Sequence, residues 1–175
     1  VVNVFSLFFG PLILLPLSIG DVTKKLQEGE IELKDVPVAV VGVPGNIASI
    51  AAIMLAAYAS ELTLIQRSGS SHRVDSLIER IRAIRPGIKI NLTDDLYSLK
   101  NAKLILTATI SGESFIKSEH ISQDKTVICD VAVPHDVLDE VLHERPNTTI
   151  IDGGVVRLPC NENFSIAGIP LQQGR

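Results

Sequence analysis

The feature that most constrains the fold is a glycine turn between two apolar segments. Val36–Gly42 is a continuous apolar run, as expected of a strand buried on both faces. Residues 46–58 are rich in Ala, Ile, Leu and Met, which predicts a buried helix. The joining segment, Gly42-Val43-Pro44-Gly45-Asn46-Ile47-Ala48, places its small residues at G-x-x-G-x-x-A spacing. Strand, tight turn and helix in this order predict an α/β domain.

Each small residue of the turn has a separate use. Gly42 permits a sharp exit from the strand, Gly45 lets a diphosphate approach the backbone, and Ala48 lets the helix pack closely on the sheet. The helix start adds free N–H groups and a partial positive charge. We therefore predict that a dinucleotide binds here, the alternative being a tight turn without a ligand. The predicted contacts are Gly42, Pro44, Gly45, Asn46, Ile47 and Ala48.

Strands and helices alternate through the rest of the chain. Further strands are predicted at residues 62–66, 88–91, 103–107, 126–130 and 149–153. Val74, Leu77, Ile78 and Ile81 recur at helical spacing, and this helix should end before Pro86. The fold class is therefore α/β, a doubly wound, mostly parallel sheet of the Rossmann type.

Two polar residues are predicted to begin shorter helices. Thr93 is expected to cap a brief helix, with Asp94 and Asp95 favoured by its positive end. Asp136 is expected to cap a helix that runs to Glu144.

The end of the second strand predicts the choice of cofactor. An acidic residue at this place would bind the ribose 2'-hydroxyl of NAD, but the chain continues Gln66-Arg67-Ser68, with Arg73 nearby. A guanidinium suits a 2'-phosphate through charge-assisted hydrogen bonds. NADP is therefore the predicted cofactor, with NAD possible, and Arg67 and Ser68 join the predicted contacts. The alternative is a solvated arginine on a surface loop.

Three loops of the second half should meet the same edge of the sheet, where ligands of open α/β sheets bind. Thr107-Ala108-Thr109 could line a ribose or cap local backbone. Asp130-Val131-Ala132 ends the next strand, and Asp130 could orient backbone or substrate. Gly153-Gly154 allows a flat ring to approach, or merely a sharp turn.

The remaining polar residues exclude some classes of function. The net charge is −4 and no basic stripe is present, so nucleic acid is not an expected partner. Cys129 and Cys160 have no metal-ligand spacing, which predicts no metal site and a reducing, cytoplasmic compartment. Cys129 should be a core residue and Cys160 a loop thiol.

The histidines fall into two groups. His72, His120 and His143 are expected to be solvated. His135 alone lies at a strand end near the predicted cleft, where it could touch the substrate.

The ends of the chain differ from its middle. Residues 1–20 carry no charge and are long enough to span a bilayer, but Gly10, Pro11 and Pro16 argue against a spanning helix. We expect residues 1–35 to be an apolar segment and linker that remains from an upstream region. Residues 36–170 should form the NADP-binding domain, and residues 171–175 a truncated tail.

Taken together, these motifs resemble the NADP-binding domain of long-chain acyl-[acyl-carrier-protein] reductases and the predicted amino-acid dehydrogenases grouped with them. The stretch Cys129-Asp-Val-Ala-Val-Pro-His-Asp-Val137 is more loosely similar to glutamyl-tRNA reductase, and the core to shikimate dehydrogenase. The resemblance covers residues 36–170. It implies hydride transfer from a nicotinamide to an activated acyl group or a related carbonyl, held as a small molecule or on a carrier.

The resemblance assigns no catalytic residue in this chain. The acyl reductases hold the acyl group on a cysteine in a segment after this domain, and Cys160 does not match that motif. Two alternatives remain beside the enzyme domain: a non-catalytic, regulatory nucleotide-binding module, and a membrane-tethered form of either. A homo-oligomer is also possible.

Overall fold

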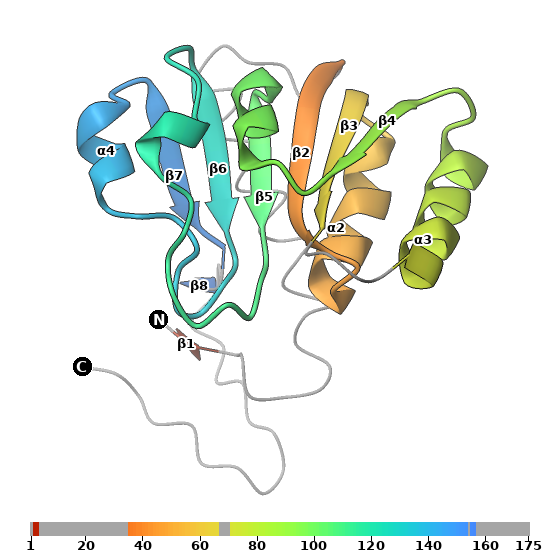
Figure 1. Ribbon diagram of the computed structural model, residues 1–175, viewed down its shortest axis with the longest axis horizontal. Coiled ribbons are helices and arrows are strands. Elements are labelled where there is room, and N and C mark those ends of the chain that lie inside the picture. The colour runs from red at the N-terminus through yellow and green to blue at the C-terminus, as the bar shows by residue number, and fades with distance from the viewer. Residues whose placement is uncertain (1, 4–34, 67–70, 154, 157–175) are drawn as a thin grey trace, which may run out of the picture.

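The centre of the protein is a parallel sheet of six strands (Figure 1). The computed structural model describes residues 2–3, 35–66, 71–153 and 155–156. The strands of the sheet are β2 (Val36–Val43), β3 (Ala59–Gln66), β4 (Lys89–Thr93), β5 (Leu104–Thr107), β6 (Thr126–Asp130) and β7 (Thr148–Asp152). Their spatial order is β4-β3-β2-β5-β6-β7, and each neighbouring pair is parallel. The predicted doubly wound sheet is confirmed.

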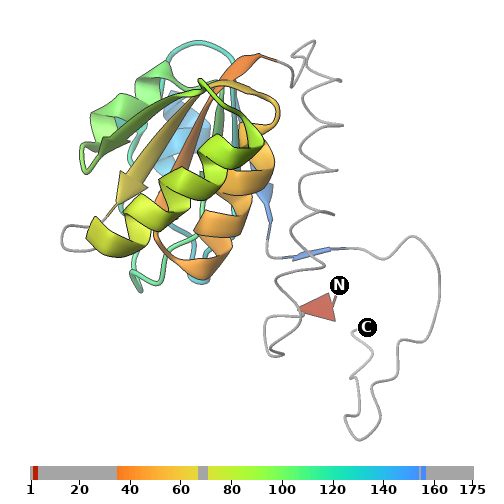
Figure 2. The same cartoon turned by 90° about the vertical axis from the view of Figure 1, so that its right-hand side faces the viewer.

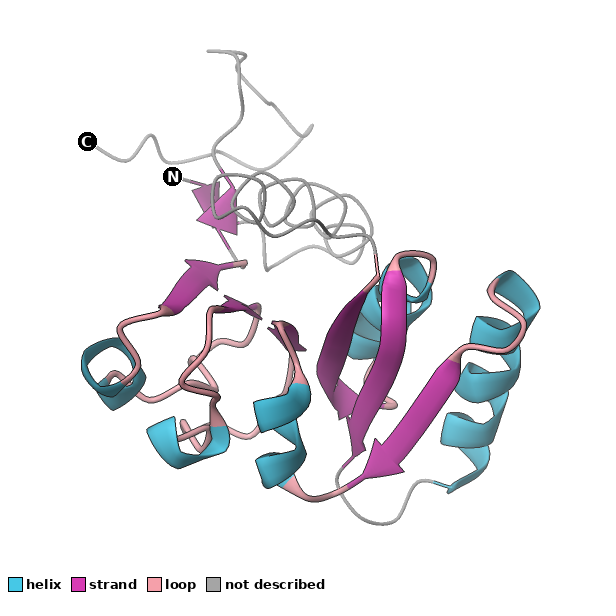
Figure 3. Cartoon of the chain, turned by 90° about the horizontal axis from the view of Figure 1, so that it is seen from above, coloured by secondary structure: helices cyan, strands magenta, loops and turns pink. Residues whose placement is uncertain are grey.

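Helices cover both faces of this sheet (Figures 2 and 3). The two longer ones, α2 (Asn46–Ala56) and α3 (Ser71–Ile84), lie on one face. The other face carries α4 (Glu140–Glu144) and two 3₁₀ helices, η1 (Leu96–Asn101) and η2 (Ser118–His120). Because side chains alternate along a strand, β2 contributes Val38 and Val40 to one core and Ala39 and Val41 to the other.

A second, two-stranded sheet was not predicted from the sequence. It pairs β1 (Val2–Asn3) antiparallel with β8 (Val155–Val156). Residues 4–34 and 157–175, which contain most of the apolar segment, Cys160 and the tail, lie outside the described residues. Within the described residues, no helix combines the length and apolar character needed to cross a membrane.

Two predicted helix caps are wrong. Asp95, not Thr93, caps η1: its carboxylate accepts the Tyr97 N–H at 2.9 Å, while the Thr93 hydroxyl accepts the Asp95 N–H at 3.0 Å. Asp136 begins no helix, because its carboxylate bonds to another loop, and the chain continues through a bend and an isolated bridge between Val137 and Ile116. The helix after β6 consequently spans only α4.

The prediction for His120 is also wrong. The side chain is 9% exposed, and its Nδ1 accepts the Lys117 N–H at 3.0 Å. Burial lowers the pKa of this imidazole, and nearby Lys117 and Lys100 act in the same direction. Cys129, by contrast, is fully buried in the core, as predicted.

The amino ends of β2 and β3 are joined to α3 by one guanidinium. Arg85 donates to the carbonyl oxygens of Ala56, Ala57 and Ala59 where α2 ends, and pairs with Asp35 at 3.2 Å. Carbonyls at the end of a helix have no partner within it, so the cation satisfies groups that would otherwise need water.

Candidate functional site

The site lies where the strand order reverses, between β2 and β5, at the carboxyl ends of the strands. Gly42 leaves β2 with φ +102°, and a Cβ there would stand 2.5 Å from the Ala108 carbonyl oxygen. Gly45 donates its N–H to the Gly42 carbonyl at 2.8 Å, and a Cβ on it would stand 2.7 Å from that oxygen. Both positions therefore need glycine for the turn itself.

The turn leads into the start of α2, whose first N–H groups point away from the helix body. Gly45 is the N-cap and supplies no side chain, and the first turn contains no acidic residue. The Ser49 N–H bonds to Gly45 at 2.8 Å, so the N–H groups of Asn46, Ile47 and Ala48 precede the first helical hydrogen bond. Such amides suit an anion. Ala48 is fully buried against the sheet, as predicted.

A cation lies beside this helix start. Arg73 Nη2 donates to the Pro44 carbonyl at 3.0 Å and lies 3.4 Å from Asn46 Oδ1. The guanidinium is exposed and joins α3 to the glycine turn. It adds positive charge where the turn already favours an anion. Arg67, Ser68 and Gly154 lie outside the described residues.

The loop after β5 is held by the carboxylate of Asp136, the residue predicted from the sequence to cap a helix. Asp136 is fully buried and accepts hydrogen bonds from the hydroxyls of Thr107 and Thr109 and, at 3.1 Å, from the Thr109 N–H. The Ser111 hydroxyl lies 3.3 Å away. In the sequence, the alternating hydroxyl residues Thr107, Thr109 and Ser111 at the end of a strand are the pattern that could have indicated a shared buried acceptor.

Asp136 thus fixes Thr107-Ala108-Thr109 in its place against Gly42. The hydroxyls of Thr107 and Thr109 donate to a protein carboxylate, a partner that the sequence did not predict for either residue.

The next loop is organised by Asp130, which is 1% exposed. Its two carboxylate oxygens accept the N–H groups of Ala132 and Val137, each at 3.0 Å. The prediction that Asp130 orients backbone is confirmed. Burial raises the pKa of this carboxyl, and the two hydrogen bonds and the nearby His135 act against that rise.

Gly153 completes this part of the site. Its N–H donates to the Asp130 carbonyl at 2.8 Å. A Cβ at this position would stand 2.6 Å from Cys129 Sγ and 2.9 Å from Val131 Cγ2, so the glycine is needed for packing. Val131 and Ala132 are buried, so little of either residue is exposed to contact a ligand.

Sheet order, glycine turn and helix start define the class: an open α/β domain built like the dinucleotide-binding domains of dehydrogenases. Residues 22–152 match the shikimate / quinate 5-dehydrogenase family, and the chain belongs to that family.

Individual relatives match this chain over only part of their own length. The chain is 31% identical over 128 residues to "Aminotransferase PigE" of a Serratia species, 73% of this chain and 14% of that protein. Shikimate 5-dehydrogenase from Listeria monocytogenes, solved with shikimate and NAD, is 16% identical with a TM-score of 0.56 over 76% of this chain. A shikimate dehydrogenase solved with NADP+ is 19% identical with a TM-score of 0.55 over 80%. The chain spans 51% and 50% of these two structures, and their likeness shows the fold.

Proposed function

We propose that the chain is the NADP(H)-binding domain of an oxidoreductase that reduces a carbonyl or activated acyl group by hydride transfer. The observation that carries this proposal is the glycine turn, packed against the loop after β5 at the point where the strand order reverses. Family membership supports it, and two structures of the same fold hold NAD or NADP+. When bound, the cofactor would supply the hydride.

The residues fit the diphosphate of such a cofactor. The N–H groups of residues 46–48 face the site without a side-chain cap, and Arg73 adds a positive charge next to them. Glycine at positions 42 and 45 permits the tight turn that leads into these N–H groups, since a Cβ at either position would meet a backbone oxygen at 2.5 or 2.7 Å. The 2'-phosphate of NADP is assigned to Arg67 from its place after β3, as the charge of a guanidinium suits a phosphate.

The finer assignments rest on the sequence. For an acyl substrate, small or carrier-bound, the support is the resemblance of the combined motifs to those of acyl-[acyl-carrier-protein] reductases. The cytoplasmic location and a homo-oligomer stay predictions.

Calorimetric titration of NADP+ and NAD+ into the full 175-residue chain tests the cofactor assignment. We expect NADP+ to bind more tightly, and Arg67→Ala to reduce that preference by about tenfold or more, since hydrogen bonds to a charged group contribute about 1.5–3 kcal/mol. Arg80→Ala, on the exposed side of α3, is the matched control and should leave the preference unchanged. If neither nucleotide binds, the proposed function is wrong. Binding without turnover of any carbonyl probe by the full-length protein would favour the regulatory module.

A further inference from the structure

One histidine lies between two carboxylates at the ends of neighbouring strands. Asp130 and Asp152 end β6 and β7 and are paired in register. His135 Nδ1 lies 3.7 Å from Asp130 Oδ2, and its Nε2 lies 4.0 Å from Asp152 Oδ2. The imidazole therefore spans both strand ends, at the edge of the sheet that carries the glycine turn.

The backbone that carries this ring is fixed at several points. Asp130 binds the N–H groups of Ala132 and Val137, one on each side of His135. The Ser114 hydroxyl donates to the His135 carbonyl at 2.6 Å. The His135 side chain is nevertheless 53% exposed. A fixed backbone with an accessible ring is the arrangement that a proton-transferring group needs.

The position of the ring relates it to one half of the proposed cofactor. In sheets of this order the diphosphate crosses the reversal point, and the two nucleosides extend over opposite halves. Arg67, after β3, assigns the adenosine to the β3 side. The nicotinamide then extends over β5, β6 and β7, where His135 stands.

Resting on the proposed function, we propose that His135 is a catalytic residue, the group that exchanges a proton with the substrate, and that Asp130 and Asp152 position its ring. Reduction of a carbonyl needs a hydride on carbon and a proton on oxygen. The reduced nicotinamide, when bound, supplies the hydride and is oxidised. Protonated His135 gives its proton to the oxygen that receives the carbonyl electron pair, becomes neutral and is reprotonated from solvent. With an acyl thioester, the C–S bond breaks and the proton goes to the leaving thiolate.

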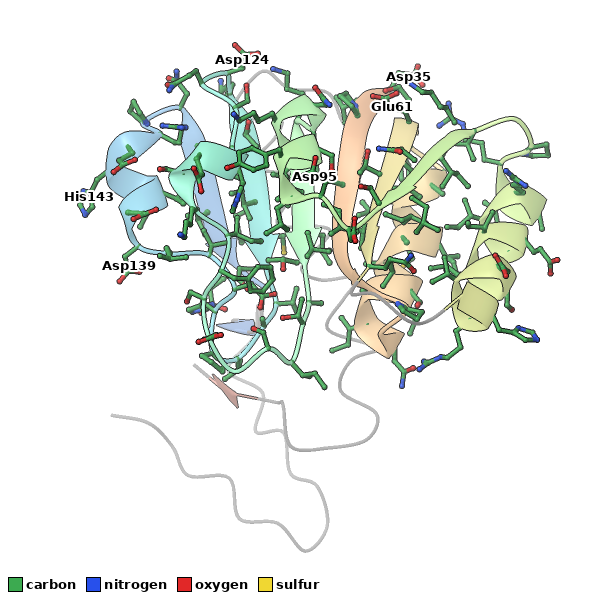
Figure 4. The ribbon with its side chains drawn as sticks, viewed as in Figure 1. Asp35, Glu61, Asp95, Asp124, Asp139 and His143 are labelled. Carbon is green, nitrogen blue, oxygen red and sulfur yellow. The ribbon has the colours of Figure 1, made fainter. Side chains whose placement is uncertain are left out.

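Histidine-resolved modification by diethyl pyrocarbonate, read by mass spectrometry on the full chain, tests where His135 stands. Saturating NADP+ should slow modification of His135 by about fivefold or more, whereas adenosine 2',5'-bisphosphate, which lacks the nicotinamide, should not. The exposed His143 on α4 is the internal control, and its rate should not change (Figure 4). Equal modification of His135 with and without bound NADP+ would overturn the proposal.

The result is separable from a failure of the proposed function, because calorimetry measures NADP+ binding independently. The role in proton transfer has a second readout. With NADPH and an acyl-coenzyme A thioester or a short aldehyde as probe, His135→Gln should lower kcat by about 100-fold or more, with the Kd of NADP+ within twofold. His143→Gln is the matched control. An unchanged kcat in His135→Gln would exclude the proton-transfer role.

Discussion

The Gly42 Cα faces the Ala108 carbonyl so closely that a methyl group on Gly42 would stand 2.5 Å from the oxygen. Two loops from the halves of the sheet thus meet backbone to backbone at the reversal point. The contact joins the part of the site proposed to bind the diphosphate to the part that Asp136 holds.

Gly42→Ala should therefore be strongly destabilising. The positive φ and the backbone clash together should cost about 3 kcal/mol or more of unfolding free energy, measured by urea denaturation. Gly87→Ala is the matched control: its φ is +84°, but nothing lies within 4 Å of the added Cβ, so the expected loss is about 1 kcal/mol. Equal losses in the two variants would contradict the close contact.

Asp136→Ala should destabilise the protein by about 2–4 kcal/mol, because the buried hydroxyl of Thr107 and the half-buried donors of Thr109 lose their acceptor. Asp136→Asn keeps one carbonyl oxygen and should cost less. Asp139→Ala is a control on the same loop, since that side chain is exposed and makes no capping hydrogen bond (Figure 4). A loss below about 1 kcal/mol in Asp136→Ala would show that the carboxylate does not hold the loop.

The difference between Asp136 and Gly42 shows how far the sequence could predict the site. The glycine turn was predictable because its geometry is local: strand, turn and helix are consecutive in the chain. From the sequence alone, Asp136 is predicted to cap a helix. Its hydrogen-bond partners in the structure lie 25–29 residues away in the chain. Its role depends on β5 and β6 being parallel neighbours, which no local pattern encodes.

The same reasoning applies to the histidines. His120 lies in a polar segment, yet its ring is buried by the η1–η2 contact, edge-on to Tyr97 at 5.1 Å. The fold class, in contrast, could be predicted from the alternation of predicted strands and helices alone, because that pattern repeats along the chain.

Arg85→Ala should lower the unfolding free energy by about 1–2 kcal/mol, since carbonyls at the end of α2 lose a charged donor. Arg85→Lys should lose less, because an ammonium can still serve one or two of these carbonyls. Arg82→Ala, exposed in the last turn of α3, is the matched control. Urea denaturation gives the three values, and an Arg85→Ala loss no larger than that of Arg82→Ala would contradict the capping role.

His120 should make the protein less stable in mild acid. Because its pKa in the folded state is lowered from the ordinary 6.5, its contribution is fully present above about pH 6.5 and is lost as the pH falls through the folded-state value. His120→Asn retains an acceptor for the Lys117 N–H without titrating and should flatten this dependence. Unfolding free energies at pH 7.5 and 5.5 measure it, with His143→Asn as control. An unchanged slope in His120→Asn would contradict the assignment.

The most direct measurement of the central claim is a ¹H–¹⁵N correlation spectrum of the full chain during titration with NADP+. A diphosphate on the start of α2 should shift the amide signals of Asn46, Ile47 and Ala48 more than other amides. The signals of Glu61 (Figure 4) and of Lys89, which pairs with it near the amino ends of β3 and β4, should not shift. Saturable binding of NADP+ without a shift of these three amide signals would contradict the proposed diphosphate site at the start of α2.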